Sequence, residues 1–414
     1  MKISANFNQS PTESTMVTCP ACGLLCDDVV LSSTSPIKVN TSCAKSIDFF
    51  EQTYSKVTPS IAGKATDLKT AIKTAAQILD KSNQPLFAGL GTEVQGMRAL
   101  LRLAEKTSAT LDHMHSESTV RNTLALQNSG WQTTTLTEVK NRADVILAIG
   151  TDIVSSHPRF FEKLVWNTDS LFDKAKPEVI YLSNASETEN LPEIINALNV
   201  LANGKKLRTD NIAGVSVGSL MEILDKLKAA QYAVVVWSAS NLKFSHAELT
   251  IQSITRLIAK LNETTRVAGL PLNSGDGDTS INNTSTWLSG YATRSRLSNG
   301  QAEYDAYRFS TKQQIKQCDT LLWLSTFNAY EPPQTDAPTI VIGHPNTQFT
   351  RTPDVFIPVG IPGLDHTGTM FRMDSAVTLP LKKVRHVELP KLSDVIAQIE
   401  AQLFDLNQVE LDQA

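Results

Sequence analysis

Four of the five cysteines in this 414-residue chain lie near its start, in the stretch VTCPACGLLCDDVVL and the following TSCAKS. They are Cys19, Cys22, Cys26 and Cys43, with the spacing C-x2-C-x3-C-x16-C. Three close thiolates and one remote thiolate are typical of an iron–sulfur site, because one tight loop wraps three corners of a cluster and a neighbouring segment supplies the fourth. Structural zinc prefers paired C-x2-C knuckles, and the second pair is missing. The spacing favours a 4Fe–4S cluster over zinc or over four thiols that bind no metal.

Composition and charge restrict the classes of partner. The formal net charge is −4 and the pI is about 6.0, and no basic patch is evident, so neither nucleic acid nor an anionic membrane is expected as a partner. No run of 18 apolar residues predicts a membrane span. The polar start lacks the apolar core of a secretory signal and is expected to be a frayed arm over about a dozen residues. We therefore expect a cytoplasmic protein, in which disulfides are not favoured.

The elements that must position these cysteines are short apolar strands alternating with helices. The stretch TDLKTAIKTAAQILDKS predicts a helix capped by Thr66 or Asp67. The alternation predicts an α/β protein with parallel sheets covered on both faces, in two Rossmann-like lobes that follow a small cysteine-containing unit. The Gly/Ser/Asn-rich stretch 270–290 is expected to be loop, and the polar tail 403–414 is expected to be loose.

Several further motifs carry a resemblance to a known family. The cysteine spacing, CAK at 43–45, ADVILAIGTDIVSSHPRF and PDVFIPVGIPGLDHTGTMFRMD resemble segments of the molybdopterin oxidoreductases. CPACGLLCDDV, LALQNSGWQTTTLTEVKNRADVILAIG and GTMFRMD resemble the B subunits of formylmethanofuran dehydrogenases most closely, over roughly residues 17–400. Within that family, the chain is most similar to the version in the bacterial formyltransferase/hydrolase complex.

The resemblance implies a formate dehydrogenase-like fold with a discontinuous domain. The expected division is an iron–sulfur-type domain at 1–60, an α/β domain at 61–115 and 269–402, an inserted Rossmann-like domain at 116–268, and a tail at 403–414. A cleft is then expected between the two Rossmann-like lobes.

The resemblance also implies a metal ligand that this chain lacks. In the dehydrogenases a cysteine or selenocysteine ligates molybdenum or tungsten, and the matching position here is close to Ser118. Ser118 or Asp112 as a substitute ligand is one alternative, and loss of the metal is the favoured one. His157 and Arg372 are expected to line the remnant pterin cleft, and Lys45 is expected between the cluster and that cleft.

Other candidate residues are given structural roles. His113 and His115 form an H-x-H pair without an evident third ligand, so a surface or packing role is favoured over a metal site. Asp365 and His366 are neighbours in the sequence and could act together in acid–base catalysis, although a role in lining a pocket is favoured for them. Cys318 precedes an apolar strand and is expected to be a small core residue.

The functional expectation follows from the family. The chain is expected to be the B subunit of a formyltransferase/hydrolase complex that converts formylmethanofuran to formate in tetrahydromethanopterin-linked one-carbon oxidation. Its role would be mainly structural, without molybdopterin or tungstopterin, and a 4Fe–4S cluster bound by the four cysteines stays one of the alternatives. The expected partners are an amidohydrolase-like A subunit, a C subunit and a formyltransferase D subunit. The alternative is a catalytic, redox-active dehydrogenase subunit with molybdenum or tungsten pterin and a 4Fe–4S cluster.

Overall fold

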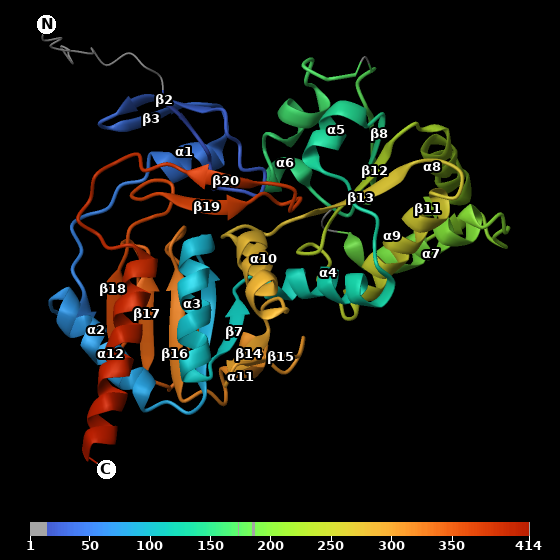
Figure 1. Ribbon diagram of the computed structural model, residues 1–414. Coiled ribbons are helices and arrows are strands. Elements are labelled where there is room, and N and C mark those ends of the chain that lie inside the picture. Colours follow the sequence, from blue (N-terminus) through green and yellow to red (C-terminus); the bar gives the residue numbers. More distant parts are fainter. Residues whose placement is uncertain (1–14, 173, 184–186, 414) are drawn as a thin grey trace, which may run out of the picture.

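The structure is a computed structural model that describes residues 15–172, 174–183 and 187–413. The arm expected over the first dozen residues lies outside this described part. The chain forms a large α/β lobe, a small N-terminal unit above it, and a smaller inserted α/β lobe beside them (Figure 1). Among the helices in the described ranges, none has the length and apolar character needed to cross a membrane.

The large lobe is built on a nine-stranded mixed sheet. Across the sheet its strands are β15 (Gln301–Tyr304), β14 (Ser295–Ser298), β7 (Thr110–His113), β6 (Pro85–Gly91), β16 (Thr320–Ser325), β17 (Thr339–Gly343), β18 (Val355–Pro358), β4 (Ser60–Ile61) and β5 (Lys64–Ala65). The strands from β7 to β18 pair in parallel, and the strands at both edges pair antiparallel. The prediction of a parallel sheet, made from the alternation of strands and helices, is therefore wrong for the strands at both edges. The Asn299–Gly300 pair, a typical hairpin turn, was the local signal for one of these edges.

The helices α2 (Leu68–Asp80), α3 (Val94–Thr107) and α12 (Leu392–Gln413) lie on one face of the large sheet (Figure 1). Their apolar residues form one buried core with those of the sheet. Asp67 caps α2 by accepting a hydrogen bond from the Thr70 amide, which confirms one of the two predicted caps. The expectation of a loose tail from residue 403 is wrong, because α12 continues through these residues to Gln413.

The inserted lobe carries a parallel four-stranded sheet. Its strands are, in order, β13 (Val267–Leu272), β12 (Ala233–Ser238), β8 (Val145–Ile149) and β9 (Glu178–Leu182). Its helices are α4 (Ser116–Ser129), α5 (Leu136–Arg142), α7 (Leu191–Ala202), α8 (Val217–Ala229) and α9 (Ala247–Leu261). Because β13 pairs with β12, the sheet of this lobe extends past the boundary expected at residue 268.

The N-terminal unit contains the strands β1 (Thr15–Val17), β2 (Val29–Thr34) and β3 (Ile37–Asn40) and the helix α1 (Ala44–Phe50). A late hairpin of β19 (Gly368–Phe371) and β20 (Thr378–Leu381) packs on this unit, and the Met373 amide donates to the Gly23 carbonyl over 3.0 Å. One buried core joins the unit, the hairpin and the inserted lobe through Phe50, Met370 and Phe160. These three parts therefore hold one another in place.

The expectation of loop throughout 270–290 is wrong, because α10 (Asp278–Ser289) lies there. Its Ser-, Thr- and Asn-rich sequence has low intrinsic helix propensity. Tertiary contacts compensate, since Ile281 is fully buried in the core of the large lobe and the Asp278 carboxylate accepts from the Ser274 amide over 2.7 Å.

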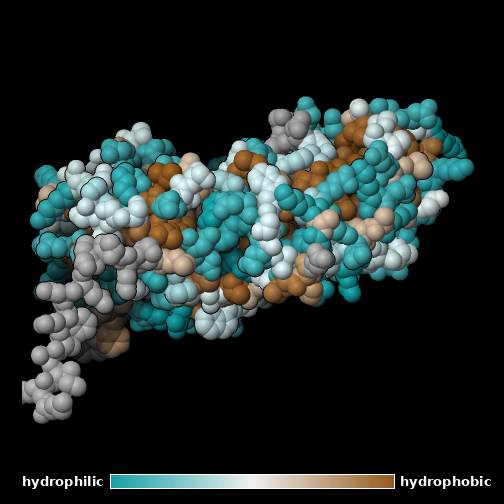
Figure 2. Space-filling model, turned by 90° about the horizontal axis from the view of Figure 1, so that it is seen from above, coloured by the Kyte–Doolittle hydropathy of each residue, from teal (hydrophilic) through white to brown (hydrophobic). Residues whose placement is uncertain are grey.

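Short elements complete the described chain. They are α6 (Ile153–Ser156), a π-helical turn (Phe161–Val165), a 3-10 turn (Thr188–Asn190), β10 (Asn211–Ile212), β11 (Val215–Ser216) and α11 (Thr311–Gln314). Seen from above, the molecule is elongated, and hydrophobic residues lie in separate patches among hydrophilic ones (Figure 2).

Candidate functional site

The four clustered cysteines line one small cavity, which we call the thiol pocket. The loop before β2 folds back on itself, because the Cys19 amide donates to the Cys26 carbonyl over 2.8 Å and the Leu25 amide donates to the Cys22 carbonyl. Cys43 approaches from the neighbouring segment, where it precedes α1. The pocket measures about 10 Å³, which is close to the space that one water molecule needs.

The thiol pocket disfavours free thiolates. Burial raises the pKa of Cys19 and of Cys26 to about 12, and it also raises the pKa of Cys22. Thiols with such pKa values stay protonated at neutral pH unless a bound metal stabilises the thiolate. Within the described ranges, no group of three or more His, Cys, Asp or Glu side chains is arranged to hold a single metal ion.

Two cationic side chains border the thiol pocket, Lys45 and Arg159. The positive charge of each acts to lower the pKa of Cys22. Arg159 also makes two parallel hydrogen bonds to the Asp28 carboxylate, over 2.7 and 2.8 Å. Although burial acts to raise the pKa of Asp28, hydrogen bonds from Arg159 and Lys163 lower it to about 2. The ion pair with Asp28 fixes Arg159 beside the thiols, and Lys45 is held by the Ser156 carbonyl, to which it donates over 2.7 Å.

A much larger cavity of about 730 Å³ lies between the three parts of the molecule, and we call it the central cavity. Its volume is typical of sites for small molecules and cofactors. Its walls come from residues 20–22 and 45–52 of the N-terminal unit, the start of α4, residues 156–157 and 240–243 of the inserted lobe, and residues 273–276 and 327–330. Lys45 and Cys22 line both this cavity and the thiol pocket, so the two sites are adjacent.

Ser118 lies in the wall of the central cavity, in the first turn of α4. Its hydroxyl oxygen is 2.8 Å from the His115 carbonyl, to which it donates, and 2.5 Å from the Ser274 hydroxyl. These two contacts engage the Ser118 hydroxyl, the group at the position expected to match the lost metal ligand. Among all five cysteines of the chain, Cys22 is the one that lines this cavity.

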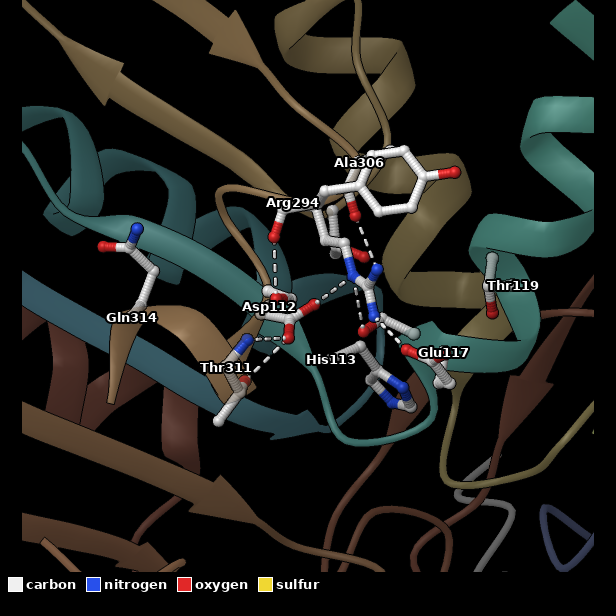
Figure 3. Close-up of polar contacts among 12 residues, drawn as sticks. Asp112, His113, Glu117, Thr119, Arg294, Ala306, Thr311 and Gln314 are labelled. Carbon is white, nitrogen blue, oxygen red and sulfur yellow. Dashed lines mark hydrogen bonds and ion pairs between the residues drawn. The ribbon is translucent and has the colours of Figure 1, made fainter. Parts of the chain in front are cut away.

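Asp112, the other candidate for a substitute ligand, does not line the central cavity. Its carboxylate accepts from the amide and the hydroxyl of Thr311 and lies 3.5 Å from Arg294 (Figure 3). The buried Arg294 also donates to Ser116 and to Glu117, at the start of α4. Asp112 therefore belongs to a structural network that anchors the helix carrying Ser118.

His157 lies in the wall of the central cavity. Its Nε2 is 2.9 Å from the Asn273 amide oxygen and its Nδ1 is 3.0 Å from the Ser156 hydroxyl. Burial lowers the pKa of His157 from its ordinary value of 6.5 to about 4, and the charge of Lys45 acts in the same direction. The imidazole is therefore neutral at physiological pH and is held by neutral partners.

This depressed pKa predicts a loss of stability in mild acid. Between pH 6.5 and 4 the unfolded chain binds a proton at His157 that the folded chain does not, so stability falls as the pH falls. From pH 8 to pH 5 the unfolding free energy should drop by about 2 kcal/mol on this account. His157→Gln should show a drop smaller by that amount in urea unfolding at the two pH values. A variant with the full wild-type pH dependence would contradict the assignment.

His115 is a second histidine that lines the central cavity. Its Nε2 is 2.8 Å from an Asp276 carboxylate oxygen. Burial is the largest single effect and acts to lower the pKa of His115, but the hydrogen bond to Asp276 and the negative charges of Asp276 and Asp278 together raise it. His113 is buried and its Nε2 contacts the Asp276 backbone carbonyl over 3.2 Å, so the H-x-H pair is held together by one residue.

Arg372 is not brought into the central cavity. It pairs with Asp374 over 2.6 Å and lines a separate cavity of about 460 Å³ beside Cys26. Asp365 and His366 also lie elsewhere: Asp365 pairs with Arg385, and both His366 ring nitrogens contact backbone carbonyls. Cys318 is only partly buried and packs against the edge of a core cluster of the large sheet.

Sequence reasoning missed the residues that complete the central cavity, chiefly Asn273, Ser274 and Asp276 of the NSGDGD stretch. Arg121 and Lys243 were also missed. The available signal was the run of glycine and polar residues directly after a buried strand, since open α/β sheets bind ligands beyond the carboxyl ends of their strands.

Comparison with known proteins identifies relatives of this chain. No protein-family model matches the chain. It is 30% identical to the B subunit of the formyltransferase/hydrolase complex Fhc of Methylorubrum extorquens, over 75% of this chain and 87% of that protein. It is 26% identical to the B subunit of the tungsten-containing formylmethanofuran dehydrogenase 2 of Methanococcus maripaludis, over 91% of this chain and 95% of that protein.

A solved structure is similar over most of the chain. It belongs to the crystal structure of the formyltransferase/hydrolase complex FhcABCD from Methylorubrum extorquens in complex with methylofuran. The TM-score is 0.71 with 26% sequence identity, and the match covers 84% of this chain and 99% of the other.

Proposed function

Because the chain belongs to the family that unites the B subunits of the Fhc complex and of formylmethanofuran dehydrogenase, we propose that it is the B subunit of a formyltransferase/hydrolase complex. In this role it holds the catalytic subunits, and it has lost the redox pterin site of the dehydrogenases. The complex would release formate from a formylated furan carrier of the methanofuran or methylofuran type, within tetrahydromethanopterin-linked one-carbon oxidation.

The observation that carries this proposal is the state of Ser118. A soft metal such as molybdenum or tungsten prefers a thiolate. The start of α4 offers instead a hydroxyl that already donates to the His115 carbonyl and contacts Ser274. Asp112 is committed to Thr311 and Arg294 and does not reach the cavity. The residues at this position therefore do not fit the pterin-bound metal of the dehydrogenases.

The number and spacing of the thiols in the thiol pocket favour a 4Fe–4S cluster over zinc. A single tetrahedral zinc ion, bound at about 2.3 Å, would need all four sulfur atoms within roughly 4 Å of one another. The described thiols converge on one cavity but form no such cage. A cluster spreads its thiolates over four irons, and Cys19, Cys22, Cys26 and Cys43 would ligate it. We propose this cluster and a molybdopterin oxidoreductase-like fold with an N-terminal cysteine domain.

The second candidate is a working dehydrogenase subunit with molybdenum or tungsten pterin. The size of the central cavity favours it, as does Lys45, which lines both the cavity and the thiol pocket. Its weakness is the absence of any cysteine between Cys43 and Cys318, which leaves the cavity without a separate thiolate ligand.

The expected partners are the A, C and D subunits of the complex. The segment 153–172 of the inserted lobe exposes several large hydrophobic side chains, among them Val154, Trp166 and Leu171. Such exposed apolar side chains are typical of surfaces that contact other proteins. This agrees with a scaffold that binds neighbouring subunits, with the amidohydrolase-like A subunit and the formyltransferase D subunit carrying the chemistry.

The test is a metal analysis of the complex purified without oxygen. We expect about four irons per copy of this chain and neither molybdenum nor tungsten. We also expect release of formate from the formylated carrier without any electron acceptor. Molybdenum or tungsten near one per chain, with acceptor-dependent activity, would replace the proposal with the dehydrogenase. Zinc in place of iron would overturn the cluster but leave the family role intact.

A further inference from the structure

One buried hydroxyl in the thiol pocket has no hydrogen-bond partner among the described residues: that of Ser46, in α1. The residue is 1% exposed, and the side-chain oxygen is shielded from solvent. Leaving a hydroxyl unpaired in the interior costs about 1–3 kcal/mol. A serine in a helix commonly satisfies itself by bonding a backbone carbonyl one turn earlier, and Ser46 makes no such bond.

The side chains that share this pocket leave few acceptors for the hydroxyl. Besides the four cysteines, the pocket is lined by alanine, leucine and valine side chains and by Lys45 and Arg159, whose cationic groups only donate. Among the side chains that line the pocket, the atoms that can accept are therefore the cysteine sulfur atoms. Cys19 is the sulfur that Ser46 acts on, because the Ser46 side chain acts to lower the pKa of that thiol while burial, the larger effect, raises it.

A neutral thiol is a weak acceptor, whereas a metal-bound thiolate is a strong, negatively charged one. The unpaired hydroxyl thus gains a partner when the four cysteines bind metal. We propose that Ser46 donates a hydrogen bond to the Cys19 thiolate of the bound cluster and thereby raises its reduction potential. This inference rests on the cluster assigned under the proposed function.

The physical reason for the shift is the extra negative charge of the reduced cluster. A hydrogen bond to a cluster sulfur stabilises the reduced form more than the oxidised form, so removal of the donor makes reduction harder. Ser46 is thus a positioning residue that acts through Cys19 and is not a ligand. The effect requires no catalytic electron transfer by this chain.

The test compares Ser46→Ala with wild type in the complete complex purified without oxygen. Iron per copy of this chain and the midpoint potential of the cluster are measured, the latter by electron paramagnetic resonance during a reductive titration. We expect Ser46→Ala to keep its iron and to shift the midpoint to a more negative value. Ser46→Thr, which keeps the hydroxyl, should restore the wild-type potential.

Ser32→Ala is the matched control, since Ser32 is an exposed serine of the same unit whose hydroxyl donates to the Lys38 carbonyl. It should leave the potential unchanged. An identical potential in wild type and Ser46→Ala, with iron retained in both, would overturn this inference and leave the cluster assignment standing. A wild-type complex that holds no iron would overturn the cluster and this inference together, and assembly with the other subunits would then still test the proposed role in the complex.

Discussion

Replacing Arg294 with alanine is expected to lower the free energy of unfolding by about 3–5 kcal/mol. Arg294 is only 4% exposed and lies just before β14, at the junction of the large lobe with the start of α4. It donates to Glu117 over 2.9 Å and to Ser116 over 3.2 Å, and it is the cation closest to the buried Asp112 (Figure 3). Its removal would leave the Asp112 carboxylate buried without a counter-charge.

The measurement is urea unfolding followed by far-ultraviolet circular dichroism. Alanine keeps the β-carbon, so the left-handed backbone at Arg294 is strained equally in both proteins and does not contribute to the difference. Arg308→Ala is the matched control: its side chain is 52% exposed and pairs with the exposed Glu303, so a loss below about 1 kcal/mol is expected. Similar losses for the two variants would show that Asp112 does not depend on Arg294 for its charge balance.

The second large effect is expected from Trp237→Ala, which should cost about 3–5 kcal/mol. Trp237 in β12 is fully buried in the core of the inserted lobe. Its ring lies 6.0 Å from the ring of Trp131, and its Nε1 donates to the Asn122 side chain over 3.0 Å. The alanine variant would combine a large cavity with an unpaired amide oxygen on Asn122.

Trp287→Ala serves as the comparison, because Trp287 is 64% exposed and its main contact is the guanidinium of Arg98, 6.0 Å from the ring centre. A loss of at most about 1 kcal/mol is expected there. Equal losses at Trp237 and Trp287 would contradict the view that the inserted lobe depends on a packed core beneath its sheet. Both variants lose one tryptophan, so circular dichroism is the appropriate readout.

Local patterns in the sequence predicted much of the architecture. The periodicity of 68–80 with Asp67 before it predicts α2 and its cap, and the apolar runs predict strands such as β8 and β12, because these features depend on neighbours in sequence. The strands at the edges of the large sheet were misjudged, since pairing direction depends on a distant partner strand. The helix α10 was missed because its stability comes from the packing of Ile281 into the core of the large lobe and not from the intrinsic helix propensity of its residues.

For the candidate site, the sequence by itself determined the four thiols, the adjacent Lys45 and the absence of a thiolate near Ser118, because residue types and short spacings need no fold to be read. The tertiary structure alone decided which of these residues meet. It brings Ser118 to Ser274 and His157 to Asn273, pairs separated by more than a hundred positions, while it leaves Arg372 in a different cavity. Contacts of this kind form where separate parts of the chain pack together, as the N-terminal unit, the β19–β20 hairpin and the inserted lobe do on one core. Packing across long sequence separations has no local signature in the sequence.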